Sequence, residues 1–279
     1  MRKLIASIAP CIALSFSLLT ATAAFSQDAP APGAKYVALG SSFAAGPGVA
    51  TQLGTCGRSD HNYSHLVAAE LGLTLTDVSC SGATIPNIVN STQRDAAPQI
   101  DAVSRDTALV TVTIGGNDIR FTPSTCACAG KAPADNCTAN LDQAAISAPV
   151  KQLPARLETM LDAIHAKAPQ AIVVLVACPR AFPTDAINCR ELELSSNDSA
   201  YLAALGQKLE AAFVSATSGQ RNLIADAYVL AEGHGPCATS ERWINGAQVA
   251  NTGVRYHPTA EGHIEMARLV LAALGNNSE

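Results

Sequence analysis

The chain has 279 residues, of which 48% are hydrophobic and 15% are charged, and its formal net charge at pH 7 is −5. Its basic residues are scattered along the sequence, which argues against a nucleic-acid partner. The length suits a single domain with a sizeable core.

The first 26 residues have the pattern of a secretory signal peptide. Arg2 and Lys3 precede an uncharged apolar run, and the small residues after it fit a cut before Gln27 or, alternatively, after Ala23. A membrane anchor is the other interpretation, but the run is short for a spanning helix. Removal of this leader changes the net charge from −5 to −7. We therefore expect a secreted protein, extracellular or, if the source has an outer membrane, periplasmic.

After the leader, residues 27–35 form a Pro/Ala-rich spacer, and residues 36–279 are expected to form one domain. No later apolar run is long enough to span a bilayer, so no integral membrane segment is expected after signal cleavage.

Continuous apolar runs alternate with helical patterns along this domain. Unbroken apolar runs are typical of parallel strands that are covered on both faces. They occupy residues 36–39, 108–115 and 171–177, with weaker candidates at 73–79 and 222–227. Helical patterns occupy residues 62–72, 153–168, 198–216 and 258–274. The alternation predicts a three-layer α/β/α, doubly wound, mostly parallel sheet, in which ligands bind at the carboxyl ends of the strands.

Eight cysteines follow Cys11, which lies in the leader. An even number of cysteines in an exported chain predicts disulfides. Zinc is the alternative, but zinc ribbons use paired C-x-x-C knuckles and this chain has one C-x-C, so no metal is expected. Three cysteines lie between residues 121 and 145, where the weak periodicity predicts a loop. The eight are Cys56, Cys80, Cys126, Cys128, Cys137, Cys178, Cys189 and Cys237.

The first predicted strand ends in "GSSFAAG", which contains Ser41 and Ser42. Small residues at this point serve a tight turn, or one serine is presented as a nucleophile. A hydroxyl nucleophile needs a base, and its reaction needs donors for the developing oxyanion.

Three later motifs supply candidates for these roles. Gly82 in "SCSGAT" and Asn117 in "IGGND" follow predicted strands, and His257 in "RYHPTAEGH" precedes the last predicted helix. Taken singly, each has a structural explanation: a turn, a cap and an ordinary loop histidine. Their joint occurrence, in order and at strand ends, favours a catalytic site.

The four motifs together resemble those of the SGNH (GDSL) hydrolase family. "GSSFAAG", "SGAT", "GGND" and "YHPTAEGH" match its four blocks, and the likeness runs from about Tyr36 to the C-terminus. The segments "CGRSDHNY", "SCSGAT" and "CPRAF" are most similar to secreted, disulfide-bonded esterases and lipases of the actinomycete type. The resemblance implies the flavodoxin-like SGNH hydrolase fold.

The resemblance also implies the site residues. Ser42 would be the nucleophile, His257 the general base, and the N–H groups of Ser42 and Gly82 with the Asn117 side chain the oxyanion hole. It implies a serine carboxylic ester hydrolase, an esterase or lipase active in lipid degradation, that works through an acyl-enzyme. It needs no cofactor, takes a small-molecule or lipid ester, and is expected to be a monomer. The alternatives are a carbohydrate O-deacetylase on the same fold and a non-catalytic binding protein.

The sequence departs from the family at two positions. The family usually has Asp where this chain has Ser41, and a serine hydroxyl can make similar local turn bonds. The family's acid usually lies three residues before the histidine, where this chain has Val254. A main-chain carbonyl can hold the tautomer of a histidine. We therefore expect a Ser42–His257 dyad supported by the Val254 carbonyl, with Asp118 structural.

Two disulfides are implied by the spacing in the secreted relatives, Cys56–Cys80 and Cys189–Cys237. The other four cysteines, Cys126, Cys128, Cys137 and Cys178, are then expected to form two more bridges in an unknown order.

Overall fold

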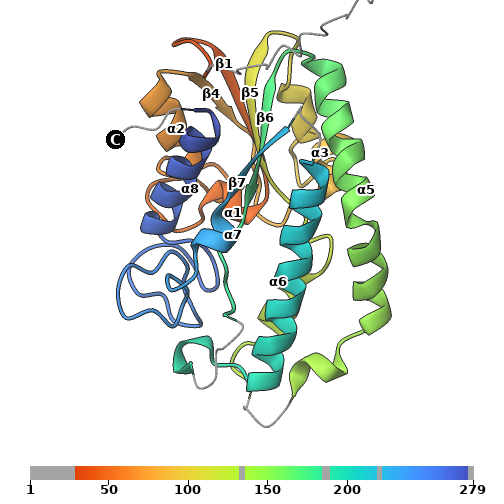
Figure 1. Cartoon of the computed structure of the whole chain (residues 1–279), viewed down its shortest axis with the longest axis vertical. Coiled ribbons are helices and arrows are strands. Elements are labelled where there is room, and N and C mark those ends of the chain that lie inside the picture. The colour runs from red at the N-terminus through yellow and green to blue at the C-terminus, as the bar shows by residue number, and fades with distance from the viewer. Residues whose placement is uncertain (1–28, 132–135, 184–188, 219–221, 276–279) are drawn as a thin grey trace, which may run out of the picture.

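The computed structural model describes residues 29–131, 136–183, 189–218 and 222–275. Its centre is one sheet of five parallel strands in the order β4-β1-β5-β6-β7, with helices on both faces (Figure 1). This confirms the predicted three-layer, doubly wound architecture. The strands are β1 (Lys35–Gly40), β4 (Thr74–Asp77), β5 (Thr107–Thr113), β6 (Ile172–Ala177) and β7 (Asn222–Asp226). Because β1 lies between β4 and β5, the strand order reverses at β1, which is where such sheets bind ligands.

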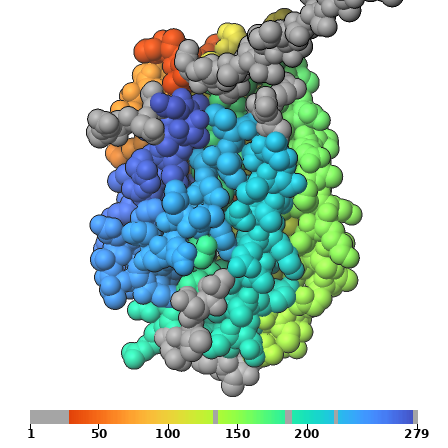
Figure 2. Space-filling view, viewed as in Figure 1, coloured from red at the N-terminus to blue at the C-terminus, as the bar shows by residue number. Residues whose placement is uncertain are grey.

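Two groups of helices cover the sheet (Figure 1). One face carries α2 (Tyr63–Leu71) and α8 (Ala260–Ala273), and the other carries α3 (Ile85–Val89), α5 (Gln143–Lys167) and α6 (Ser196–Ala216). Figure 2 shows α5 and α6 along one side of the molecule, with the segment between α7 and α8 beside them. The short elements are α1 (Ser42–Ala45), β2 (Gln52–Leu53), β3 (Arg58–Ser59), η1 (Gln99–Ala102), α4 (Phe121–Cys128), η2 (Cys137–Asn140), η3 (Arg190–Leu192) and α7 (Ala227–Leu230).

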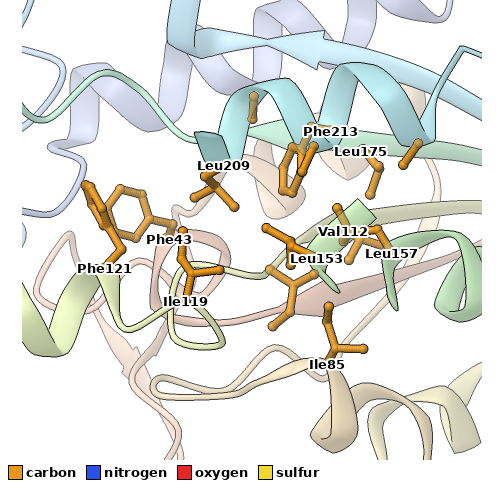
Figure 3. Close-up of a cluster of buried hydrophobic side chains, with 14 of the residues drawn as sticks. Phe43, Ile85, Val112, Ile119, Phe121, Leu153, Leu157, Leu175, Leu209 and Phe213 are labelled. Atoms are coloured by element: carbon orange, nitrogen blue, oxygen red, sulfur yellow. The ribbon is translucent and has the colours of Figure 1, made fainter. Parts of the chain in front are cut away.

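The core consists of two apolar clusters, one on each face of the sheet. Between the sheet and α5 and α6, Val112 and Leu175 pack with Leu153 and Phe213, all almost fully buried (Figure 3). The other face has a second cluster with α2 and α8, which includes Val174. Burial on both faces explains why the central strands β1, β5 and β6 are mostly apolar, whereas the edge strands β4 and β7 are only partly buried.

Helix α5 is longer than the sequence pattern predicts. It begins at Gln143, because the Asp142 side chain accepts hydrogen bonds from the N–H groups of the first turn. Pro149 and Pro154 lie inside the helix, where each removes a hydrogen-bond donor. Such prolines usually mark helix ends, so the pattern predicted a start at residue 153.

The described cysteines form three disulfides rather than the expected four. Cys56 is linked to Cys80 and Cys189 to Cys237, the two pairs implied by the resemblance, and Cys128 is linked to Cys137. Cys126 and Cys178 are free, so the expectation of a fourth bridge is wrong. The segment from Phe121 forms α4 rather than a loop, and this directs Cys128 inward and Cys126 to the solvent. Cys178 follows β6 and packs against the core.

The predicted signal peptide, residues 1–26, lies outside the described residues. Within the described part of the chain, none of the helices combines the length and the apolar character needed to cross a membrane.

Candidate active site

Strand β1 ends in a turn that presents Ser42. Gly40 has φ 146°, and a Cβ atom there would lie 2.5 Å from the carbonyl oxygen of Thr113, so only glycine fits. The N–H of Ser41 donates to the same carbonyl at 2.9 Å. Ser42 is then the first residue of α1, where a helical N–H has no partner within the helix. Among the described residues nothing accepts this N–H, so it is free to bind a ligand.

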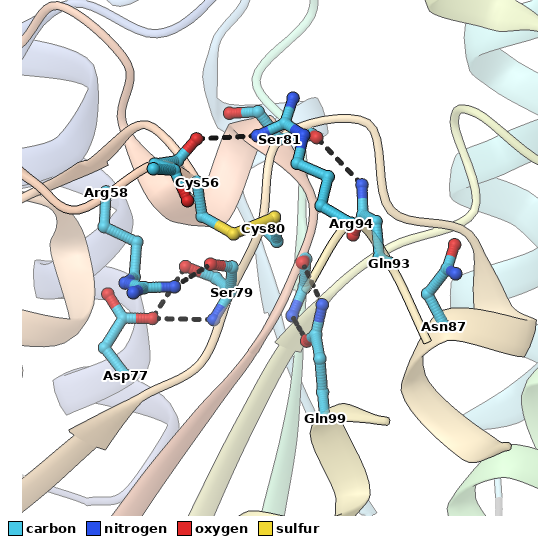
Figure 4. The surroundings of a disulfide bond; sticks show 12 residues. Cys56, Arg58, Asp77, Ser79, Cys80, Ser81, Asn87, Gln93, Arg94 and Gln99 are labelled. Atoms are coloured by element: carbon cyan, nitrogen blue, oxygen red, sulfur yellow. Dashed lines mark hydrogen bonds between the residues drawn. A yellow bond between two sulfur atoms is a disulfide. The ribbon is translucent and has the colours of Figure 1, made fainter. Parts of the chain in front are cut away.

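A buried amide holds the same turn from the other side. The Gln99 side chain, 4% exposed, accepts a hydrogen bond from the N–H of Gly40 at 2.8 Å and donates to its carbonyl at 3.0 Å (Figure 4). Cys80 also donates its N–H to that carbonyl. The end of β1 is thus bonded to the chain after β4. The sequence pattern carried no signal for Gln99.

The glycine motif lies in the loop that follows β4. Gly82 has φ 88°, and within the described residues no acceptor takes its N–H. The Cys56–Cys80 disulfide crosses the base of this loop (Figure 4). The N–H of Ser81 donates to the Cys56 carbonyl at 2.9 Å, and the Gln93 side chain donates to the Ser81 carbonyl at 3.0 Å. The loop is therefore held at Cys80 and Ser81, directly before Gly82.

A buried carboxylate couples the nucleophile helix to the glycine loop. Asp77, at the end of β4, accepts hydrogen bonds from the Ser79 N–H at 2.9 Å and from the Asn62 side chain at 2.8 Å. The same Asn62 nitrogen donates to the carbonyl of Ala45, the last residue of α1. Sequence analysis missed this network because Asp77 belongs to no motif, and nothing in the quoted segments around Asn62 and Ser79 shows that they meet at one carboxylate.

The asparagine motif follows β5 and contains two differently used side chains. The Asn117 amide nitrogen donates to the Ala83 carbonyl at 2.9 Å, which leaves its second hydrogen available. Asp118 accepts from the N–H of Ile85 at 3.1 Å and from Arg156 at 2.6 Å. Burial raises the pKa of Asp118, and the Arg156 guanidinium opposes this shift. Asp118 thus joins α3 to α5.

The histidine motif brings His257 to Ser42, 215 residues away in the sequence. The His257 Nε2 atom lies 2.8 Å from the Ser42 hydroxyl, and its Nδ1 atom lies 2.8 Å from the carbonyl oxygen of Arg255. The prediction that Val254 supplies this carbonyl is therefore wrong by one residue. The Val254 carbonyl instead accepts from the N–H of His257 at 3.2 Å and from the Asn245 side chain at 3.3 Å. If Nδ1 donates its proton to Arg255, Nε2 is the acceptor for the serine hydroxyl.

His257 is buried beside the nucleophile. The residue is 8% exposed, and the Phe43 ring centroid lies 4.9 Å from that of the imidazole. Burial lowers the pKa of His257, and the Arg255 carbonyl partly opposes this. The neutral imidazole, which is the form that accepts a proton, is thus favoured.

His263, the second histidine of the same motif, should make the free energy of unfolding depend on pH. His263 is fully buried, and its Nδ1 atom accepts the N–H of Tyr63. Burial lowers the pKa of His263 to about 3 from its ordinary 6.5. Between these values the unfolded chain binds a proton that the folded chain does not. Stability is therefore full above pH 6.5 and falls as the pH drops toward 3, by on the order of 2 kcal/mol between about pH 6.5 and 4.5.

Urea unfolding at those two pH values measures this effect, with His263→Asn as the comparison. Asn keeps an acceptor but does not titrate, so the variant should lose less stability on acidification than the unmodified chain. An equal loss in both proteins would show that His263 is not the responsible group.

Comparison with known proteins identifies the family. Residues 38–263, which include Ser42, Gly82, Asn117 and His257, match the GDSL-like Lipase/Acylhydrolase family. Lipase 2 of Streptomyces coelicolor is 33% identical over 297 residues, which cover 98% of this chain and 97% of that lipase. The lipase of Streptomyces rimosus is 32% identical over 236 residues, 81% of each chain.

Solved structures agree with this assignment. The extracellular lipase from Streptomyces rimosus has a TM-score of 0.70 and 27% identity, over 86% of this chain and 99% of that chain. Phospholipase A1 from Streptomyces albidoflavus NA297 shares the fold, with a TM-score of 0.72 and 24% identity over the same shares of the two chains. The chain therefore belongs to the GDSL-like lipase/acylhydrolase family and is a carboxylic ester hydrolase.

Proposed function

We propose that this enzyme is a secreted esterase or lipase in which Ser42 and His257 act as a catalytic dyad. The observation that carries the proposal is the 2.8 Å contact between the Ser42 hydroxyl and the His257 Nε2 atom. This distance allows the proton transfer that makes a serine hydroxyl nucleophilic.

The reaction follows from the positions of these groups. Ser42 attacks the ester carbonyl carbon while His257 accepts its proton. The N–H groups of Ser42 and Gly82 and the amide of Asn117 donate to the oxyanion. His257 then protonates the leaving alcohol, and the acyl group stays on Ser42. Water, deprotonated by His257, attacks the acyl-enzyme and releases the acid together with free Ser42.

The Arg255 carbonyl takes the place of a triad carboxylate in this mechanism. It accepts the Nδ1 proton of His257 and so holds the tautomer in which Nε2 faces Ser42. As a neutral group it stabilises the imidazolium less than a carboxylate does. Asp118 is not positioned for this role, because both of its oxygens bond to Ile85 and one also to Arg156.

Asp118→Asn should leave kcat nearly unchanged and lower the free energy of unfolding by about 2 kcal/mol, the range for a hydrogen bond to a charged group. The reason is that its partner is Arg156, not His257. Kinetics and urea unfolding on the same protein separate the two effects. Asp226→Asn, which alters the N-cap of α7, is the control. A loss of kcat on the order of 10⁴-fold with the fold retained would instead identify Asp118 as a triad acid.

We further propose that the substrate is an ester with an apolar acyl chain. One contact beside the dyad supports this: the Phe43 ring packs against His257, with 4.9 Å between the ring centroids. Relatives of this chain are lipases by name. An apolar side chain at this point can contact the methylene groups of an acyl chain.

Hydrolysis of p-nitrophenyl esters from acetate to dodecanoate, beside release of acetate from acetylated xylan, tests this proposal. We expect kcat/KM to rise with acyl length beyond acetate, and Ser42→Ala to be inactive on every ester. Faster turnover of acetylated xylan would favour a carbohydrate O-deacetylase. The absence of any turnover would favour a binding protein.

We also propose that residues 1–26 are removed on export, that residues 36–279 form a single domain, and that the mature enzyme is a monomer acting outside the cell. The leader pattern supports the first point. N-terminal sequencing of secreted protein should begin at Gln27, and light scattering should give the monomer mass.

A further inference from the structure

Tyr256, the neighbour of His257, has an unusual backbone conformation. Its φ is 57°, which bulky side chains rarely adopt and glycine adopts freely. The Val254 carbonyl accepts the N–H of His257 three residues later, as in a β-turn. Arg255 is not among the residues with positive φ. A negative and then a positive φ in the two central residues is the pattern of a type II turn, whose third position normally holds Gly or Asn.

This turn type determines which way the Arg255 carbonyl points. In a type I turn, with negative φ at both central residues, the peptide between them is rotated by roughly 150° relative to type II. That peptide carries the Arg255 carbonyl, which accepts the His257 ring nitrogen at 2.8 Å. With a negative φ at Tyr256, the carbonyl would face away from the ring.

Tyr256 is anchored through both its side chain and its backbone N–H. Its hydroxyl donates to the Leu192 carbonyl at 2.7 Å, and its ring packs on Phe182. Its N–H donates to the Gly246 carbonyl at 3.1 Å, and the residue is 5% exposed. These contacts compensate for a backbone conformation that a tyrosine otherwise avoids.

We propose that Tyr256 is a positioning residue: its buried side chain holds a glycine-like backbone conformation that turns the Arg255 carbonyl toward His257. The inference rests on the proposed dyad. In it, Tyr256 orients the His257 ring by positioning the Arg255 carbonyl, a role that a carboxylate side chain otherwise has. The Tyr256 side chain bonds to Leu192 and packs on Phe182, not on Ser42 or His257, so it would act on the reaction through the Arg255 carbonyl.

Tyr256→Gly and Tyr256→Ala form the test pair. Both remove the side-chain contacts with Leu192 and Phe182 and keep the backbone N–H, but glycine accepts a positive φ without steric cost and alanine does not. If the backbone conformation matters, the glycine variant should keep a kcat about 10-fold above that of the alanine variant, the factor that one net hydrogen bond provides, with similar KM. A role in packing alone predicts the reverse, because glycine adds disorder and fills no more space than alanine.

The pH profile gives a second readout. The Arg255 carbonyl raises the pKa of His257, so its loss should move the acid limb of kcat/KM to lower pH. The shift should be larger in Tyr256→Ala than in Tyr256→Gly. His263, the titratable neighbour of His257, stays neutral in this range because its pKa is about 3.

Tyr256→Phe keeps the contact with Phe182 and removes only the hydrogen bond to Leu192. It can therefore test the role of the side chain even if the glycine and alanine variants fold poorly. It should show a lower kcat and a small shift of the acid limb in the same direction. An unchanged kcat and pH profile in this variant would overturn the anchoring role. Equal kcat and equal acid limbs in the glycine and alanine variants would overturn the backbone role.

Glu241, with φ 48° in the same segment, is the matched control. Its glycine and alanine variants should differ in stability but not in the pH profile. Ser42→Ala separates the two proposals. If Ser42→Ala remained active, the dyad itself would be wrong. If it were inactive while the Tyr256 variants matched one another, only the inference about Tyr256 would fail.

Discussion

Ser42→Ala should reduce kcat for ester hydrolysis on the order of 10⁶-fold while leaving the fold intact. A nucleophile and its base act as a unit, and loss of either removes almost the whole chemical contribution. In the described structure the Ser42 hydroxyl bonds only to His257, so its removal disrupts no structural contact. Kinetics with an aryl ester measure the loss of kcat, and thermal unfolding of the same protein shows whether the fold is retained.

Ser41→Ala is the matched control, because Ser41 is the adjacent residue of the same type and equally buried. Its side chain makes no capping hydrogen bond to α1. The variant should therefore keep kcat within a few-fold of the unmodified enzyme. An inactive Ser41→Ala beside an active Ser42→Ala would show that the wrong serine has been assigned.

Asn117→Ala should lower kcat by about 10²–10³-fold, the usual cost of one oxyanion donor, with a much smaller change in KM. The amide nitrogen is held by the Ala83 carbonyl, beside Gly82, so its second hydrogen can point at the developing oxyanion. An interaction made only in the transition state appears in kcat rather than in KM. Steady-state kinetics across the ester series measure the ratio.

Asn87→Ala controls for the structural effect of losing an asparagine near the same loop. Asn87 caps α3 by accepting hydrogen bonds from Thr84. Its removal should cost about 1 kcal/mol of stability and little activity. If Asn117→Ala raised KM and left kcat unchanged, Asn117 would bind the ground state and would not belong to the oxyanion hole.

The central strands of the sheet could be predicted from sequence because they are buried on both faces. Val110, Val112 and most of their neighbours in β5 are buried, so the predicted run at residues 108–115 is mostly apolar and has no charged residue. The four candidate site residues could also be predicted from the sequence, because each lies in a short motif at the end of such a run or at the start of a helix. The site then depends on strand order, which places β1 beside both β4 and β5.

The contacts that hold the site residues in place could not be predicted in the same way. The acceptor for His257 is a backbone carbonyl, which has no side-chain signature, and the φ of Tyr256 decides which carbonyl it is. Gln99 is a lone polar residue whose partner, Gly40, lies 59 residues away. The start of α5 was missed because Pro149 and Pro154 normally mark helix ends. In each case a long-range or backbone contact outweighed the local pattern.

The most direct test of the acyl-enzyme mechanism is labelling of the folded enzyme with a fluorophosphonate, followed by peptide mapping. Such a probe reacts with an activated serine and stays bonded to it. We predict one label per chain, on Ser42, and loss of labelling in His257→Ala, because His257 activates the hydroxyl. A label on Ser41 or on another residue, or full ester hydrolysis by protein that carries a label elsewhere than Ser42, would contradict this account.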